Sequence, residues 1–294
     1  MDDISDTLAT GMPIALFSGV WWAVANRIPY KWSDLSEPAA TFIRTTWKEQ
    51  GLKYPEKIML KEIPVTSFLA KIVMYTQELP HALAVGAPFK NRIEEFLYEK
   101  IHLESELLEE TDELKRMQLQ EKLKKVEEGL AECRFVCGHE RVHKERSHTY
   151  QMLLIQFIAP FIFHSLLKHS ANALDRHCLL PTLSAVLRKN TTRSVLEMIT
   201  FWVTAHIFER DADLHASKDP AELRAGINLF VQAQQAKAER SRVQGMRTFV
   251  LLWLLKYTHP TIPERLSYLK KALKKAERSQ HSVRSKSRTN QRKV

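Results

Sequence analysis

Glycine and cysteine are scarce in this chain, which has 8 Gly and 3 Cys among 294 residues. Hairpin turns depend on glycine, so its scarcity, together with few alternating apolar runs, argues against a mainly β fold. A small, odd number of cysteines argues against a disulfide-stabilised fold and favours a reducing compartment. We therefore predict a mainly α protein with a small β-sheet (class α+β), long enough for one large domain or two small ones.

Two short apolar segments are exceptions to the helical pattern. Residues 57–63 have the sequence K-I-M-L-K-E-I, and residues 82–85 have the sequence A-L-A-V. Both have the length of a strand and are rich in aliphatic side chains, so we predict a sheet of two or three strands beside the helices.

A basic N-terminal start is also missing, because residues 1–6 have the sequence M-D-D-I-S-D. Secretory signals begin with positive charge, so we expect a protein that is not secreted by a signal peptide. The apolar run 12–25 is shorter than the ~20 residues that cross a bilayer. We predict that residues 1–50 form a helical segment in which this run is either buried or anchored at a membrane surface.

Outside its C-terminus, the chain carries almost no net charge. The net charge is +10, and residues 270–294 alone hold ten Lys or Arg and one acid, Glu277, giving +9. We predict that residues 271–294 form a basic disordered tail that either binds anionic lipid or nucleic acid or only solubilises the protein. Confinement of the charge to this tail argues against nucleic acid as the partner of the whole protein.

The most informative motif lies in residues 137–143, C-G-H-E-R-V-H, which contain H-E-x-x-H. On a helix, this spacing places His139 and His143 one turn apart on one face, where they can share a zinc ion. Glu140 would then be the general base rather than a ligand. Random placement gives this motif in roughly one such chain in 25, so a polar helix face with two histidines is the alternative.

A four-ligand site that adds Cys133 and Cys137 to these histidines is excluded by helix geometry. At about 100° per residue the cysteines lie near 0° and 40°, whereas the histidines lie near 240° and 280°. One continuous helix cannot turn both pairs toward one ion, so we expect buried thiols.

A candidate third ligand lies downstream of the apolar run 198–203. Residues 208–213 have the sequence F-E-R-D-A-D, which places Glu209 and Asp213 one helical turn apart on one face. A lone glutamate would more often be a solvent-exposed acid. Asp213, one turn later, and the apolar helix before Glu209 favour Glu209 as a metal ligand.

The surroundings of these motifs resemble the HtpX-like and CAAX prenyl protease family of zinc endopeptidases. Residues 138–148, G-H-E-R-V-H-K-E-R-S-H, are similar to the family's G-H-E-L-G-H with a further His five residues on, here His148. The family takes its third ligand from a later E-x-x-x-D, which matches Glu209 to Asp213.

Two further motifs match in the same order along the chain. The family's His-Pro followed by Arg corresponds to His259, Pro260 and Arg265. Its N-A-F-A-x-G edge strand corresponds to residues 80–86, with His81 in place of Asn. The four motifs cover residues 80 to 270.

The resemblance implies a zincin-like metalloprotease domain over residues 51–270, interrupted by a charged helical insertion at 91–132. One Zn²⁺ per chain would be held by His139, His143 and Glu209. Asp213 would accept a hydrogen bond from a ligand imidazole.

Catalytic and substrate-binding roles follow from the same resemblance. Glu140 would be the general base, and His259 would stabilise the oxyanion. Arg265 and the edge-strand residues Ala82, Ala84 and Gly86 would bind a peptide or protein substrate.

Departures from the family leave an alternative open. Arg141 and Val142 stand where the family has an apolar residue and a glycine, and His81 replaces Asn. The alternative to an active endopeptidase is an inactive scaffold that binds partners through its basic tail.

Residues 150–167 are the most hydrophobic segment, and 18 residues are borderline for a membrane span. In HtpX-like proteins a membrane hairpin lies here, but the returning segment 195–208 is short and contains Glu197. We therefore favour burial or shallow membrane association over a full hairpin. We expect a cytoplasmic or membrane-associated protein with its active site on the cytoplasmic side.

Overall fold

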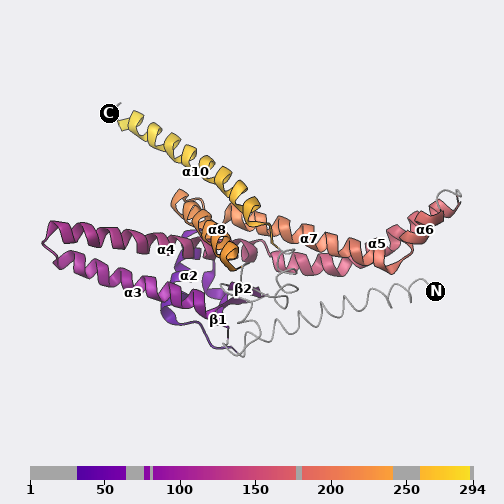
Figure 1. Ribbon diagram of the computed structural model, residues 1–294, viewed down its shortest axis with the longest axis horizontal. Coiled ribbons are helices and arrows are strands. Elements are labelled where there is room, and N and C mark those ends of the chain that lie inside the picture. Colours follow the sequence, from indigo (N-terminus) through magenta and orange to yellow (C-terminus); the bar gives the residue numbers. More distant parts are fainter. Residues whose placement is uncertain (1–31, 64–75, 80–81, 177–180, 241–258, 292–294) are drawn as a thin grey trace.

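The computed structural model describes residues 32–63, 76–79, 82–176, 181–240 and 259–291 (Figure 1). The apolar run 12–25, His81 and the apolar segment 247–257 lie outside the described residues. The described part is mostly helical with one small sheet, which confirms the predicted class.

A three-stranded sheet has the order β1-β3-β2. Strand β1 (Met59–Glu62) pairs in parallel with β3 (Ala82–Val85), and β2 (Thr76–Leu79) pairs antiparallel with β3. The strands predicted at 57–63 and 82–85 are therefore confirmed. The prediction that residues 82–86 form an edge strand is wrong, because β2 covers the side of β3 that was expected to be open.

The sheet lies against the main core. Helix α2 (Glu37–Glu49) precedes the 3-10 turn η1 (Pro55–Lys57) and buries Ile43 and Trp47 against Leu83 and Val85 of β3. All four residues of β3 are buried, which a strand covered on both faces requires. The Trp47 indole donates a hydrogen bond of 2.7 Å to the carbonyl oxygen of Cys137 and so fixes α2 against the motif helix.

The charged region forms a helical hairpin of α3 (Ala87–Glu109) and α4 (Glu113–Glu145). It breaks at residues 110–112, and Asp112 caps α4 by accepting from the Leu114 N–H at 2.9 Å. The same helix α4 then continues without interruption into the motif at 139–143, so the insertion and the motif form one rigid element.

The two cysteines on α4 are buried free thiols, as predicted for residues 133 and 137. Burial raises the pKa of Cys133 to about 12 and the pKa of Cys137 well above its usual value. Both therefore stay protonated, which agrees with their exclusion as metal ligands.

Helices α5 (His148–Arg176), α6 (Pro181–Leu187) and α7 (Asn190–His215) extend away from this core, on the side opposite to the α3–α4 hairpin (Figure 1). Of the helices described, α5 is the one long and apolar enough to cross a membrane, yet only 11% of its apolar window is buried. Of the two alternatives for residues 150–167 and 195–208, burial is therefore excluded, and shallow membrane association stays a prediction. The exposed apolar side chains include Leu154, Phe157, Ile162, Met198, Trp202 and Ile207.

The C-terminus also differs from its prediction. Helix α8 (Pro220–Arg240) packs against α10 (Ile262–Gln291), which continues as helix through most of the region predicted as a disordered tail at 271–294. Leu266 and Leu269 are buried and anchor the start of α10. Extension of an anchored helix costs little, and no Gly or Pro follows Pro263 to stop it.

Candidate metal centre

Helices α4 and α7, which carry the H-E-x-x-H and E-x-x-x-D motifs, meet at a glycine. A Cβ atom on Gly138 of α4 would lie 2.0 Å from the backbone oxygen of Ala216, directly after α7. Only glycine permits this approach, because a backbone carbonyl cannot move aside as a flexible side chain can. The contact brings the residue after Gly138, His139, next to the last two turns of α7.

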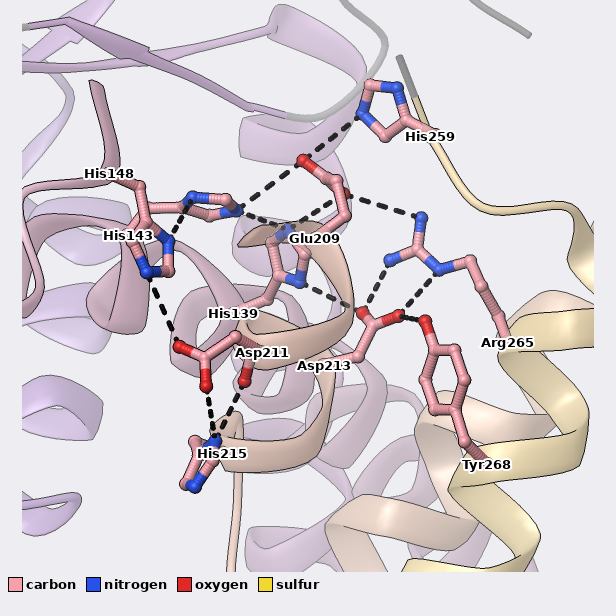
Figure 2. A network of polar contacts seen from close by, with 10 residues as sticks. All are labelled: His139, His143, His148, Glu209, Asp211, Asp213, His215, His259, Arg265 and Tyr268. Carbon is pink, nitrogen blue, oxygen red and sulfur yellow. Dashed lines mark hydrogen bonds and ion pairs between the residues drawn. The ribbon is translucent and has the colours of Figure 1, made fainter. Parts of the chain in front are cut away.

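Three candidate ligands converge where α4 and α7 meet (Figure 2). Their ligand atoms all lie within 4.8 Å of one another. The Nε2 atoms of His139 and His143 are 3.1 Å apart, and each lies 3.5 Å from a carboxylate oxygen of Glu209. The structure thus brings together the three residues that the sequence predicted as zinc ligands.

Asp213 is fully buried one turn after Glu209 and orients the first histidine. It accepts a hydrogen bond of 3.0 Å from Nδ1–H of His139, which directs Nε2 of that ring toward Glu209. Asp213 also accepts from Nε of Arg265 at 2.8 Å and from the Tyr268 hydroxyl. Its predicted position beside a ligand imidazole agrees with this geometry.

Charge complementarity keeps Asp213 ionised. Burial alone would raise the pKa of Asp213, but the Arg265 guanidinium and His139 together lower it well below its usual value. Burial would likewise lower the pKa of His139, and Glu209 and Asp213 outweigh it and raise that pKa.

His143 stays neutral because its surroundings lower its pKa. Burial, together with the neighbouring His139 and His148, lowers the pKa of His143 to about 2. A neutral imidazole keeps a lone pair, which is what a metal ligand needs.

Glu140, the predicted general base, lies next to His139 on α4. Its side chain is 8% exposed, and its charge contributes to the raised pKa of His139. The structure therefore places this carboxylate within the electrostatic reach of the ligand cluster.

His259 and Arg265 both reach the cluster from the C-terminal part of the chain, but their side chains differ in exposure to solvent. Nε2 of His259 lies 3.5 Å from Glu209, and its side chain is half exposed. Arg265 is buried and is bound to Asp213 through two nitrogens. Asp213 thus engages two of the three guanidinium nitrogens of Arg265, and the third, Nη1, lies 3.8 Å from Glu209. The substrate-binding role of Arg265 stays a prediction.

The predicted substrate-binding strand is also occupied. Ala82 and Ala84 are buried against Ile63, and Gly86 is buried at the start of α3. With β3 paired on both sides, its backbone cannot receive a substrate strand. Of the described strands, β2 is the one that contacts α4 and pairs on one side.

Sequence reasoning missed Tyr268, which contacts Asp213. A signal was present, because Tyr268 follows Arg265 by three residues and so shares its face of α10. Sequence reasoning also left Asp211 and His215 without a role. Both lie beside the site in Figure 2, where Asp211 pairs with His148 and His215. Asp211 also pairs with Arg146.

The sequence model for peptidase family M48 matches residues 62–273, more than half of the chain. The chain belongs to peptidase family M48. This confirms the resemblance drawn from the four motifs. No curated protein and no solved structure matches the chain. M48 proteins are metalloproteases, so the chain is a member of a peptidase family whose substrates are peptides or proteins.

The M48 site can be tested for its fit to a small divalent ion. Ligand atoms that lie about 2.0–2.1 Å from a tetrahedral ion are about 3.4 Å apart. The two imidazole Nε2 atoms are 3.1 Å apart, which is close to that separation. Each lies 3.5 Å from a different oxygen of Glu209, Oε2 for His139 and Oε1 for His143, so the carboxylate faces both rings. In addition, Oε2 of Glu209 is buried and accepts no hydrogen bond from the described residues. A cation would satisfy that oxygen, so the donor set of this M48 protein fits zinc.

Proposed function

We propose that this protein is a zinc-dependent endopeptidase that binds one Zn²⁺ through His139, His143 and Glu209. The observation that carries the proposal is the convergence of two imidazoles and one carboxylate, whose ligand atoms all lie within 4.8 Å of one another, which is a donor set that zinc prefers. When bound, zinc would supply a Lewis acid that lowers the pKa of a water to ~7.

The chain's own residues would supply the proton transfers. Glu140 would remove a proton from the attacking water and deliver it to the leaving amine nitrogen. His259 lies beside Glu209 with half of its side chain exposed, so its ring can donate a hydrogen bond to the oxygen that becomes negative. Asp213 and Arg265 would hold the ring of His139 in place.

Among the described residues, no strand pairs with the outer side of β2, and this side is the best candidate for holding the substrate. It contacts α4, and backbone pairing with an extended peptide needs a strand with a free side. The substrate strand is thus proposed at residues 76–79 instead of at 82–86.

The inactive-scaffold alternative loses its motivation in this structure. Arg141 is buried and donates hydrogen bonds to Glu145 at 2.6 Å and to the carbonyl oxygen of His215 at 2.8 Å. Val142 is buried in the same helix. Arg141 therefore joins α4 to the end of α7, Val142 is part of the buried side of α4, and the three ligand residues remain together. His81, the third departure, lies outside the described residues.

Replacement of the carboxylate ligand tests the proposal. Purified wild-type protein is expected to contain about one zinc per chain, and Glu209→Ala is expected to bind zinc at least about 100-fold more weakly, because one of three protein ligands is removed. The measurement is metal content by mass spectrometry, with a chelator competition for affinity. Glu128→Ala, an exposed glutamate on α4, is the control. Absence of zinc from the wild type would overturn the proposal.

We also propose that the apolar surface of α5 and α7 lies in the interface of an anionic membrane. Along α5, the exposed apolar positions run from Tyr150 to Leu166. At 1.5 Å per residue this stretch spans about 24 Å, less than the ~30 Å hydrocarbon core, so the surface suits shallow insertion. Arg176 and Arg188 near the far end would meet acidic headgroups, which favours the cytoplasmic leaflet.

Vesicle binding checks this orientation. Wild-type protein is expected to co-sediment with vesicles that contain phosphatidylserine, and the variant Leu154→Ser/Phe157→Ser/Ile162→Ser is expected to lose most of that binding. Leu108→Ser/Met117→Ser removes equally exposed apolar side chains from the α3–α4 hairpin and is the control. Equal loss in both variants, or no binding of the wild type, would contradict the proposal.

A further inference from the structure

His148 is a third buried histidine at the metal centre and is not one of the three ligand residues. It is the first residue of α5 and is 5% exposed. Its Nδ1 lies 3.0 Å from Nδ1 of His143, and its Nε2 lies 3.3 Å from a carboxylate oxygen of Asp211. Figure 2 shows the resulting line of contacts from His143 through His148 to Asp211.

The hydrogen positions along this line follow from the ligand role of His143. Its Nε2 faces His139 and Glu209, so the ring binds a metal through Nε2 and must carry its proton on Nδ1. That proton is donated to Nδ1 of His148. His148 must then carry its own proton on Nε2, which lies 3.3 Å from the Asp211 carboxylate.

The connection between α4 and α5 is built to place this ring. Ser147, between the helices, has φ 55°, in the left-handed region that residues other than glycine rarely adopt. The turn directs His148 back toward His143, one turn earlier in the chain. The ring stacks on Phe208 of α7, with 4.4 Å between centroids and an interplanar angle of 2°.

Asp211 is fixed in turn by Arg146, the residue that caps α4. The two ligand histidines are thus supported in different ways. His139 contacts its carboxylate, Asp213, directly, whereas His143 reaches Asp211 through the imidazole of His148.

We infer that His148 is a positioning residue that fixes the tautomer and ring orientation of His143 for metal binding. This inference rests on the proposed zinc function and goes beyond it, because His148 touches neither ion nor substrate. Partners of this kind, next to the ligands, commonly change metal affinity by about 10- to 100-fold when they are replaced.

Three variants separate positioning from packing. His148→Phe keeps a planar ring for the stack on Phe208 and removes the acceptor for His143. His148→Gln has an amide oxygen that can accept from His143 and an N–H that can donate to Asp211. His215→Phe is the control, because His215 contacts Asp211 without contacting His143.

The measurements are the zinc dissociation constant, by chelator competition, and the visible spectrum of the Co²⁺-loaded protein. We expect His148→Phe to bind zinc about 10- to 100-fold more weakly with an altered Co²⁺ spectrum. We expect His148→Gln to regain most of the affinity and His215→Phe to match the wild type. Thermal unfolding of each zinc-free variant reports packing separately.

Wild-type zinc affinity in His148→Phe would overturn the inference, as would equal loss in His148→Phe and His148→Gln. Either result leaves the proposed function standing if the wild type binds zinc and Glu209→Ala does not. Failure of the wild type to bind zinc overturns the proposed function instead.

Discussion

Glu140→Gln is expected to lower kcat for peptide hydrolysis by about 10²- to 10⁴-fold and to leave zinc content unchanged. Glutamine has nearly the shape of glutamate but cannot accept a proton at neutral pH. Glu140 lies beside His139 and is not one of the three ligand residues, so its replacement should not affect the coordinating atoms. The loss should therefore fall on kcat, with a much smaller change in KM.

A fluorogenic peptide library, assayed with zinc-loaded protein, gives the rates, and metal analysis of the same preparation gives the zinc content. Glu128→Gln makes the same chemical change at an exposed position of α4 and should retain full activity. Cleavage by Glu140→Gln at the wild-type rate would assign the activity to another residue or to a contaminating protease.

The second large effect concerns stability. Asp213→Asn is expected to lower the free energy of unfolding by about 3–5 kcal/mol, because it leaves the buried Arg265 guanidinium without its counter-ion. Asp213 is 0% exposed, and its two carboxylate oxygens contact Arg265, Tyr268 and His139. Urea unfolding of the zinc-free protein at pH 7 measures the difference without a contribution from metal binding.

The loss of stability caused by Asp213→Asn is expected to depend on pH. Burial would raise the pKa of Asp213, but Arg265 and His139 lower it well below its unfolded value of about 3.9. A carboxyl group with a depressed folded pKa stabilises the protein above its unfolded pKa and loses that contribution as the pH falls toward the folded pKa. The difference between wild type and Asp213→Asn should therefore narrow below about pH 3.9.

A double variant shows whether the ion pair is the cause. Arg265→Met alone removes the cation that offsets the burial of the Asp213 carboxylate, so it should also destabilise the protein. The double variant Asp213→Asn/Arg265→Met should be less destabilised than the sum of the two single changes. Strict additivity would show that the two side chains act independently.

The metal ligands could be predicted because their signals are local in the sequence. His139 and His143 share a helix face by spacing alone, and Glu209 is marked by Asp213 one turn later. The break at 110–112 was equally visible, because Asp112 is an N-cap residue between two long periodic segments. Such features depend on neighbours within a few residues.

The errors concern contacts between segments that are distant in the sequence. Strand β2, with two polar residues in T-Q-E-L, gives almost no strand signal by itself, so β3 was taken as an edge. The ion pair of Arg265 with Asp213 was missed because nothing in the sequence states that the two side chains lie together. Burial of α5 stayed open beside membrane association because an apolar sequence does not reveal whether protein or lipid covers it.

The close approach of Gly138 to Ala216 has a consequence for ion selectivity. Because a backbone oxygen is the contacting atom, α4 and α7 cannot move closer together at the ligand residues. Asp213 joins α7 to α4 through His139 and to α10 through Arg265 and Tyr268, which resists expansion. Calcium takes six to eight oxygen ligands, and this junction offers two imidazole nitrogens and one carboxylate. Main-chain packing between α4 and α7 thus holds in place a nitrogen-rich ligand set that disfavours calcium.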